Sequence, residues 1–191
     1  MPVTLEQLLQ SRDNRAKHQK DLLDSHPCRS LLCMTVQLPG PEKRNRYSLA
    51  IANAGVEAIR KAFSPEYEEL KDLETGYEGY FLVSLPAIEA KRLACRIEDT
   101  HPIGRLMDID VLMQRTEENY FSCSSPKKQF SSVICLSRGD MGLEARKCLL
   151  CGNEVRYCMR AKTHTTAQLL ARMEKMVMDY GIPKCNILEK W

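Results

Sequence analysis

The sequence predicts an α/β (α+β) fold in which helices flank one mixed sheet and a helical segment forms the C-terminus. Segments whose apolar residues recur every three or four positions, as in amphipathic helices, are interleaved with shorter segments of period two, as in strands. Interleaved helices and strands pack as layers around one sheet. The 191 residues are enough for a single domain over residues 1–191, and no internal repeat or low-complexity tract divides them.

The first part of the chain is expected to form a helix, a strand and a second helix. A capping box of Thr4 and Gln7 begins the first helix, and Pro27 stops it. The apolar stripe of this helix consists of Leu5, Leu8, Leu9, Ala16 and Leu23. Period-two spacing predicts a strand over residues 30–38, ended by a Pro-Gly-Pro turn, and helical spacing predicts a helix over residues 45–63.

The rest of the chain is expected to alternate strands with helices. The further strands span residues 67–73, 80–85 and 105–113, with residues 120–123 as a continuation of the last. Pro86 suits the first turn of a helix that ends at Asp99, and Thr166 is the candidate cap of a final helix that ends before Gly181. Residues 124–147 are polar and contain turn-forming residues, so they are expected to be a flexible segment within the domain.

Composition argues against several classes of protein. The formal net charge of +3 is too small to indicate a nucleic-acid-binding protein. The sequence contains no run of eighteen apolar residues, so no transmembrane helix is expected. The N-terminus lacks the basic and apolar regions of a signal peptide. Nine cysteines, an odd number, favour a reducing compartment in which thiols stay free or bind metal, so the protein is expected to be cytoplasmic.

An Asp-x-Asp pair lies within the expected strand over residues 105–113. Alternate residues of a strand share a face, so Asp108 and Asp110 project together, roughly 6.6 Å apart along the backbone. That spacing lets both carboxylates approach Mg²⁺, which prefers oxygen ligands. Just upstream, Gly104 allows close backbone approach and Arg105 offers a guanidinium fork suited to phosphate oxygens. Together these residues predict a phosphoryl- or nucleotidyl-transfer site.

The same residues also have a simpler interpretation. Asp108 and Asp110 could occupy the wet face of a half-exposed strand, and Arg105 could form a structural ion pair with Asp108. Asp-x-Asp alone is a weak motif, and spacing alone favours this simpler interpretation. Aspartate is depleted in strands, however, so two in one strand are less ordinary.

A cysteine cluster with the pattern C-x2-C-x6-C-x5-H lies near the C-terminus. It consists of Cys148, Cys151, Cys158 and His164. A C-x2-C knuckle commonly begins a tetrahedral zinc site. Buried, unligated cysteines beside a basic exposed face at Arg156, Arg160 and Lys162 are a slightly stronger interpretation from sequence, and a Cys-His nucleophilic dyad is a third and weaker one.

Four stretches together resemble a known family. They are Ser-Arg-Asp at 11–13, Pro-Gly-Pro-Glu-Lys at 39–43, His-Pro-Ile-Gly-Arg-Leu-Met-Asp-Ile-Asp-Val at 101–111 and the cysteine cluster with its flanks at 146–164. In this order and spacing the chain resembles the apo-citrate lyase phosphoribosyl-dephospho-CoA transferases, also called holo-citrate lyase synthases. The likeness runs from about residue 5 to about residue 178, and the joint occurrence of the last two stretches is far more specific than either alone.

The resemblance implies a reaction. Such enzymes transfer a group from 2'-(5''-triphosphoribosyl)-3'-dephospho-CoA to a serine of the citrate lyase acyl carrier (gamma) subunit, and pyrophosphate leaves. The reaction is formally a nucleotidyltransfer that needs Mg²⁺ or another divalent cation. It implies neither a nucleic-acid partner nor a membrane.

The resemblance also implies roles for particular residues. Asp108 and Asp110 would be the catalytic, Mg²⁺-holding pair, and Gly104 and Arg105 would bind phosphate. The matched positions Arg12 and Lys43 would also bind phosphate, although a solvated surface cation is the default interpretation of each. His101 would bind phosphate or take the serine proton, and a turn residue before proline is at least as good an interpretation of it. A carrier with an acidic surface could meet Lys127, Lys128, Arg156 and Arg160.

A nucleotidyltransferase-like fold is an analogy suggested by Asp-x-Asp, and this sequence departs from it. In polymerase-beta-type enzymes a glycine-serine element lies well before the acidic pair, whereas here Gly104 precedes Asp108 by four positions and is followed by Arg105. A third carboxylate is expected on a later strand, and nothing in the sequence supports Asp140 or Glu118 in that place.

Two other functions fit part of the sequence. A non-enzymatic carrier-binding module stabilised by zinc would explain the cysteines and the basic residues, and it would leave the aspartates as surface acids. A protein-modifying nucleotidyltransferase would use an ordinary nucleoside triphosphate in place of the dephospho-CoA derivative. The resemblance favours the holo-citrate lyase synthase reaction over both.

Overall fold

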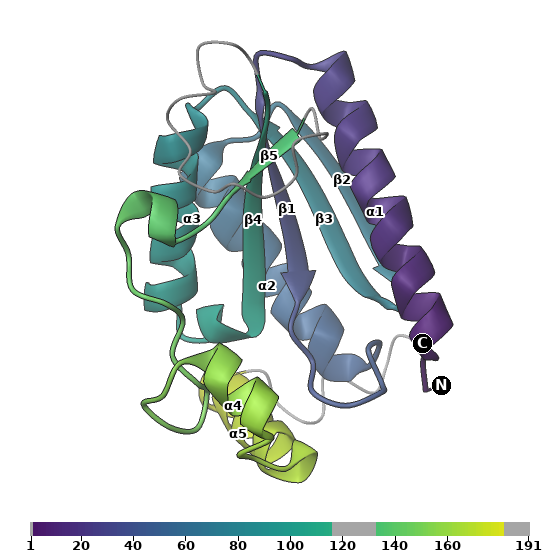
Figure 1. Cartoon of the computed structure of the whole chain (residues 1–191), viewed down its shortest axis with the longest axis vertical. Coiled ribbons are helices and arrows are strands. Elements are labelled where there is room, and N and C mark those ends of the chain that lie inside the picture. Colours follow the sequence, from purple (N-terminus) through teal and green to yellow (C-terminus); the bar gives the residue numbers. More distant parts are fainter. Residues whose placement is uncertain (1, 116–132, 182–191) are drawn as a thin grey trace.

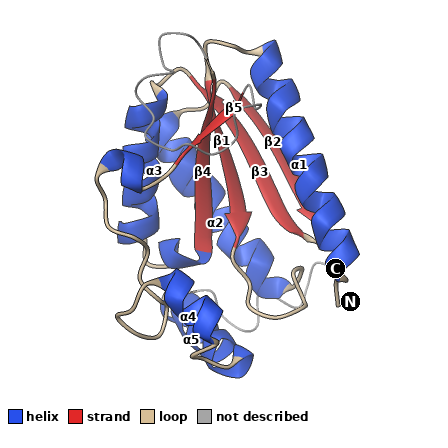
Figure 2. Ribbon diagram, in the orientation of Figure 1, coloured by secondary structure: helices blue, strands red, loops and turns tan. Residues whose placement is uncertain are grey.

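The computed structural model describes residues 2–115 and 133–181 as one sheet with helices on both faces (Figures 1 and 2). In chain order the elements are α1 (Leu5–Ser25), β1 (Ser30–Val36), α2 (Arg46–Phe63), β2 (Tyr67–Leu73), β3 (Gly76–Val83), α3 (Ala87–Thr100), η1 (Gly104–Leu106), β4 (Met107–Gln114), β5 (Val133–Leu136), η2 (Gly139–Met141), α4 (Val155–Ala161) and α5 (Thr166–Asp179). The two η elements are single turns of 3₁₀ helix. Within the described ranges, no helix has the length and hydropathy needed to span a membrane.

The sheet has five strands in the order β2-β3-β1-β4-β5, and every neighbouring pair is antiparallel. The predicted α+β class is confirmed, but the predicted mixed strand direction is wrong. Periodicity assigns a residue to a face of a strand but carries no information on the direction of the neighbouring strand. At the centre of the sheet, Thr35 of β1 lies opposite Glu78 of β3 on one side and Asp108 of β4 on the other.

The helices form two layers around this sheet. α2 and α3 cover one face and bury the main core, which includes Met34, Ile59, Phe81 and Ile109. α1 lies against the opposite face, where Leu22 and Leu23 near its C-terminus pack on Leu31 and Leu82. This second face therefore has an apolar end under the C-terminal turns of α1 and a polar remainder.

The apolar stripe predicted for α1 is wrong in its N-terminal half. Leu5 and Leu9 are exposed, whereas Arg15 and His18 turn toward the sheet. Arg15 pairs with Glu78 of β3 at 2.9 Å, and His18 pairs with Glu69 of β2 at 2.7 Å. Because the strands beneath this part of α1 carry acidic side chains, the basic side of the helix faces them. The predicted capping box at Thr4 is confirmed.

The C-terminal part forms a small helical module at one end of the sheet (Figure 1). Its helix α5 buries Met173 and Val177 against Tyr47 and Ile51 of α2, and its N-cap is Thr165 rather than Thr166. The helical C-terminus is thereby confirmed as far as Asp179.

The segment predicted to be flexible, residues 124–147, is described only from residue 133 onward. That part contains β5 and η2, and Lys147 forms a β-bridge with Glu154. The predicted strand continuation over residues 120–123 lies outside the described residues, as do Glu118, Lys127 and Lys128.

Candidate functional site

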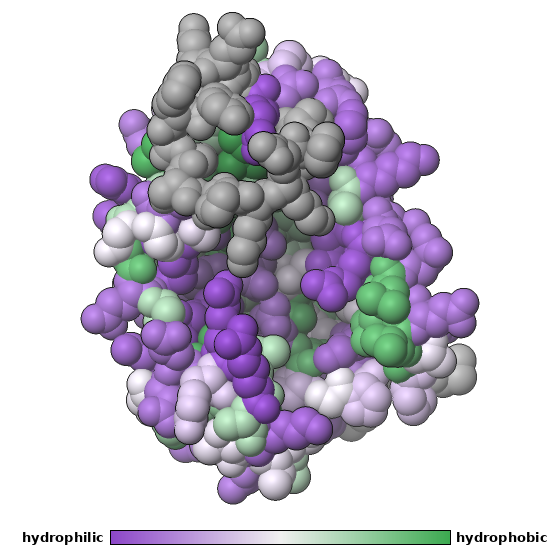
Figure 3. All heavy atoms as spheres, in the orientation of Figure 1, coloured by the Kyte–Doolittle hydropathy of each residue, from purple (hydrophilic) through white to green (hydrophobic). Residues whose placement is uncertain are grey.

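Asp108 and Asp110 lie on the polar part of the sheet face that α1 partly covers. Thr35 and Cys33 of β1 are their neighbours across the strand pair. Met107, Ile109 and Val111 are buried on the opposite face, so burial follows the alternation of the strand. The space-filling view shows the surface hollowed on this side, between α1 and the C-terminal helices (Figure 3).

The two carboxylates differ in their surroundings. Asp108 has a side chain 35% exposed, and its Oδ1 lies 3.3 Å from Nη2 of Arg146. Its Oδ2 accepts a hydrogen bond from Nε2 of Gln37 at 2.9 Å. Asp110 has no hydrogen-bond donor among the described residues; burial, and then the charge of Asp108, raise its pKa. A cation bound beside Asp110 would offset both effects.

The backbone between the two aspartates is held by side chains of α3. Ile109 donates its N–H to Oε1 of Glu98 at 2.8 Å, and its C=O accepts from Nζ of Lys91 at 3.1 Å. These groups need such partners because β5 pairs with β4 only from Val111 onward. Both Lys91 and Glu98 are buried, so α3 fixes the position of the Asp-x-Asp stretch from behind.

Arg146 is the site residue that the sequence did not reveal. Its Nη2 lies 2.6 Å from Oε1 of Glu98 and 3.3 Å from Oδ1 of Asp108, and it donates to the C=O of Met107 at 3.2 Å. In the sequence it begins the family-like stretch 146–164, two residues before the first cysteine, but it also falls in the segment predicted to be flexible, and no role was assigned to it. The ion pair with Asp108 that was considered for Arg105 is made by Arg146.

The residues of the 3₁₀ turn before β4 have contacts of their own. Arg105 donates from Nη2 to the C=O of Lys147, which ties the turn to the cysteine-bearing segment. Burial, and then the nearby charge of Arg146, lower the pKa of Arg105. At Gly104 an added Cβ would lie 2.4 Å from the backbone oxygen of Ile97. This glycine is therefore required for close packing on the end of α3; its predicted contact with phosphate stays a prediction.

The other three predicted phosphate-binding residues lie at separate places. Lys43 donates to the C=O of Leu38 at 2.6 Å, and burial lowers its pKa. His101 follows α3, where its Nδ1 accepts the N–H of Ile103 at 3.3 Å and its ring lies 5.1 Å from that of Tyr180. These contacts favour structural roles for both.

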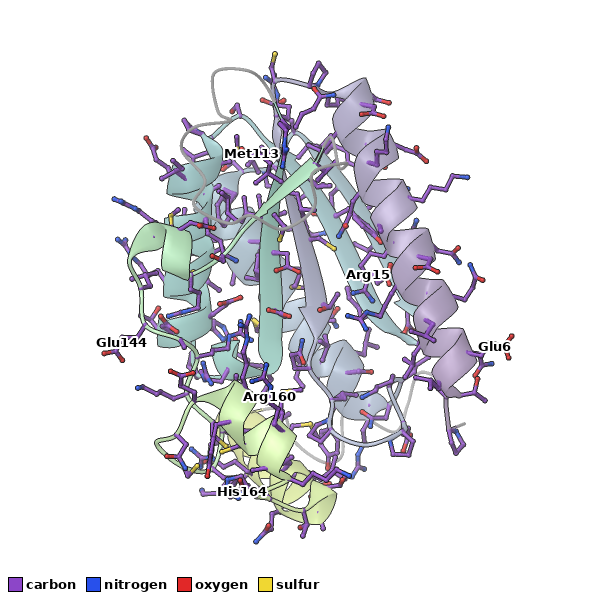
Figure 4. The ribbon with its side chains drawn as sticks, in the orientation of Figure 1. Glu6, Arg15, Met113, Glu144, Arg160 and His164 are labelled. Atoms are coloured by element: carbon purple, nitrogen blue, oxygen red, sulfur yellow. The ribbon has the colours of Figure 1, made fainter. Side chains whose placement is uncertain are left out.

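Arg12 is exposed on α1. It precedes Gln19 by two helical turns and so lies on the same side of the helix, and Gln19 bonds Cys33 of β1. Arg12 itself makes no hydrogen bond or ion pair with a described residue, so its predicted contact with phosphate stays a prediction. Arg15, one turn further on, points from α1 toward the strands (Figure 4).

Of the two residues considered as a third carboxylate, Glu118 lies outside the described residues, and Asp140 has partners of its own. Asp140 accepts hydrogen bonds at 2.8 Å from the N–H and the hydroxyl of Ser137, which makes it part of its own turn. Glu98 is the acidic side chain that the fold brings beside Asp108, where both contact Nη2 of Arg146.

The four residues of the cysteine cluster come together in space. Their ligand atoms all lie within 4.8 Å of one another. Sγ of Cys151 is 3.5 Å from Sγ of Cys158 and 3.4 Å from Nε2 of His164. Ligands about 2.0–2.3 Å from a tetrahedral zinc are separated by roughly 3.3–3.8 Å, and the two distances from Cys151 lie within that range.

Local structure explains how the cysteine cluster forms. The bridge between Lys147 and Glu154 closes a tight hairpin that carries the first two cysteines, and Cys158 lies on the short α4 that follows. Burial opposes ionisation of Cys148, but hydrogen bonds from the N–H groups of Leu150 and Cys151 and with the thiols of Cys158 and Cys151 together lower the pKa of this thiol. The structure thus favours the metal interpretation that the sequence ranked slightly below buried cysteines. His164 lies on the chain between α4 and α5 (Figure 4).

Comparison with known proteins identifies the family. The family described as apo-citrate lyase phosphoribosyl-dephospho-CoA transferase matches residues 3–180. The chain belongs to that family. Apo-citrate lyase phosphoribosyl-dephospho-CoA transferases from Shigella boydii serotype 18 and Escherichia coli O157:H7 are each 34% identical to it over 190 residues, which cover 97% of this chain and 93% of theirs. A protein from Escherichia coli K12, named as a probable transferase of the same kind, is 34% identical over the same length. The resemblance seen in the sequence motifs is thus confirmed over nearly the whole chain.

Proposed function

We propose that this chain attaches the prosthetic group of citrate lyase to a serine of the acyl carrier (gamma) subunit. The serine oxygen forms a bond to the α-phosphorus of 2'-(5''-triphosphoribosyl)-3'-dephospho-CoA. The bond from that phosphorus to the bridging oxygen of the β-phosphate breaks. Pyrophosphate leaves with the bonding electrons, and the serine proton is released to solvent or a base. The product is a phosphodiester, so the reaction is a nucleotidyltransfer.

The observation that carries this proposal is the pair of carboxylates on one face of β4. Asp108 and Asp110 would hold Mg²⁺, because burial and the charge of Asp108 make ionising Asp110 unfavourable without a cation. Bound there, the ion would neutralise charge on the phosphate oxygens. Asp108 would be oriented by Gln37 and Arg146, and Asp110 by the strand backbone that Lys91 and Glu98 hold.

We assign the cysteine cluster to structural zinc. Three thiolates and one imidazole form a closed set of four ligands, which is typical of structural rather than catalytic zinc. Such an ion would hold the hairpin at Lys147 and Glu154 against α4. A reducing compartment keeps these thiols available, which supports a cytoplasmic location.

The carrier would meet the basic, exposed residues Arg156 and Arg160 of α4, beside the exposed Tyr157. Arg160 lies on α4, which is drawn below the lower end of β4 in Figure 4. Opposite charge on a carrier surface would steer its serine toward this end of the sheet.

An intact-mass assay tests the reaction. Protein, apo carrier subunit, the triphosphoribosyl-dephospho-CoA donor and Mg²⁺ are mixed, with Asp108→Asn and EDTA as controls. The carrier should gain the mass of the prosthetic group, and the gain should disappear in both controls. No gain with folded protein and competent substrates would favour the carrier-binding module. Modification of the carrier by ATP or CTP alone would favour the ordinary nucleotidyltransferase. A gain that survives Asp108→Asn would overturn the assignment of the metal to this residue.

A further inference from the structure

We propose that Arg146 forms, beside Asp108, the subsite that binds the pyrophosphate portion of the donor, and that Glu98 is its positioning residue. This inference rests on the proposed function and extends it to a residue to which the sequence motifs assigned no role. Arg105, the arginine expected from the sequence, contacts the backbone of Lys147 instead of the aspartate pair.

The guanidinium of Arg146 is anchored by one of its nitrogens. Nη2 is the atom that pairs with Oε1 of Glu98 and with Oδ1 of Asp108, and it donates to the C=O of Met107. Its Nε and Nη1 make no hydrogen bond with any described residue. An arginine has five N–H donors in a fixed planar fork, so three of them remain for a ligand.

The anchor keeps this arginine in place without a ligand. The side chain of Glu98 is 2% exposed and that of Arg146 is 17% exposed. A buried carboxylate beside a guanidinium holds it charged and in one orientation, and the pKa of Arg146 is raised by Glu98 and then Asp108 despite burial. Oε1 of Glu98 also accepts from Ile109 N–H, so the same carboxylate positions both the arginine and the Asp-x-Asp strand.

Arg138 provides an internal comparison. It also pairs with Glu98, at 3.4 Å, and its side chain is 19% exposed. Its three nitrogens are all engaged, however, with Glu98, with Asp99 at 2.7 Å and with the C=O of Glu144 at 3.1 Å. Arg138 is thus a structural ion pair, whereas Arg146 has donors left over and lies against Asp108.

The chemistry of the proposed leaving group suits this position. Pyrophosphate is a polyanion, and a guanidinium fork recognises its oxygens through paired charge-assisted hydrogen bonds. Because Arg146 lies 3.3 Å from Asp108, it would bind the pyrophosphate oxygens adjacent to the phosphate oxygens that lie near the carboxylate pair. It would thus stabilise the negative charge that develops as the bond to the leaving group breaks.

Calorimetry with inorganic pyrophosphate and Mg²⁺ tests the subsite without the carrier or the donor. Arg146→Met should weaken pyrophosphate binding roughly 10- to 100-fold, the effect of losing hydrogen bonds to a charged group. Arg146→Lys should also weaken it, because an ammonium lacks the fork, and this variant serves if the methionine variant does not fold. Arg138→Met should stay within about threefold of wild type, although it loses the same Glu98 partner. Glu98→Gln should weaken binding less than Arg146→Met, since Gln can still accept from Ile109.

Two outcomes would contradict the inference. One is unchanged pyrophosphate affinity in folded Arg146→Met or Arg146→Lys, and the other is an equal loss in Arg138→Met. If the carrier is modified normally while Arg146 variants bind pyrophosphate as wild type does, the subsite fails and the proposed function stands. If the carrier is never modified but pyrophosphate binding depends on Arg146 alone, the subsite stands and the proposed function fails.

Discussion

Single residues of this chain act through neighbours that are remote in sequence. Asp108 is oriented by Gln37 and Arg146, and Ile109 is held by Glu98. Gly104 is an instructive case, because the sequence placed it in a phosphate-binding turn and the structure shows the packing that demands it. A side chain at this position would collide with backbone, which cannot move aside as a flexible side chain can.

Gly104→Ala should therefore destabilise the protein by about 1–3 kcal/mol, the usual effect of overpacking. The added Cβ would lie 2.4 Å from the backbone oxygen of Ile97 and 2.8 Å from that of Glu98. Gly139→Ala is the matched control, since its nearest neighbour would be a side-chain atom at 3.6 Å. Urea unfolding of both variants measures the difference, and equal midpoints would contradict the packing role.

His101 should make stability depend on pH. Burial lowers its pKa, so the unfolded chain binds a proton at this histidine more readily than the folded protein does. Stability from this group is present above the unfolded pKa of about 6.5 and is lost as the pH falls below it. The histidine accepts a hydrogen bond from Ile103, which an asparagine could also accept.

His101→Asn should thus lose less stability than wild type between pH 7.5 and 5.5. Urea unfolding at both pH values provides the measurement, with each protein compared against itself. If wild type and variant lose the same free energy of unfolding between the two pH values, this histidine does not contribute to the pH dependence of stability. A transfer assay of His101→Asn at pH 7.5 separately tests its predicted role in phosphate binding.

At the scale of elements, the site depends on how α3 meets β4. The unpaired stretch of β4 next to β5 would leave Ile109 without backbone partners, and two buried side chains of α3 supply them. An amphipathic pattern predicted α3 correctly, with bounds of Ala87–Thr100 against the expected 86–99. It did not show that Lys91 and Glu98, both charged, belong to the buried side of this helix.

Lys91→Met tests the contact between α3 and β4. Methionine keeps most of the volume but leaves the buried C=O of Ile109 without its donor, which should cost about 1–3 kcal/mol. Lys71→Met is the control, because Lys71 makes a partly exposed ion pair with Glu69 and should contribute about 0–1 kcal/mol. Urea unfolding and the Mg²⁺ dependence of pyrophosphate binding are measured together. A Lys91 variant as stable as the Lys71 variant would argue against the contact.

At the scale of the whole molecule, the cysteine cluster joins the C-terminal module to the candidate site. Arg146 and Lys147 directly precede the first cysteine, and they contact Asp108 and Arg105 respectively. Folding of the cluster therefore places Arg146. Because all four ligand atoms lie close together, a metal bound there would contribute to the stability of the folded chain.

Zinc analysis tests this arrangement. The purified protein should contain one zinc per chain, and Cys151→Ser should contain none and unfold at a lower temperature. Cys28→Ser is the control, since Cys28 is an exposed cysteine outside the cluster, and it should match wild type in both respects. Removing the zinc with a chelator should also weaken pyrophosphate binding, because the segment that carries Arg146 loses its anchor. A metal-free protein as stable as wild type would rule out a structural zinc.

The sequence by itself determined what depends on short-range spacing. Periods of two and 3.6 residues predicted the α+β class and the strand with Asp108 and Asp110. Capping chemistry predicted the N-cap at Thr4. The ligand set of the cysteine cluster was also visible, because its members lie close together in the chain. The family followed from several such stretches in a fixed order.

Only the tertiary structure decided what depends on contacts between distant segments. These contacts include the antiparallel pairing of every neighbouring strand and the packing of the polar half of α1 on acidic strands. They also include the contacts that bring together Glu98, Asp108 and Arg146. Periodicity assigns a residue to a face but does not say which other segment that face will meet. A buried ion pair between segments leaves no local pattern, so the place of Arg146 beside Asp108 became visible only in the folded chain.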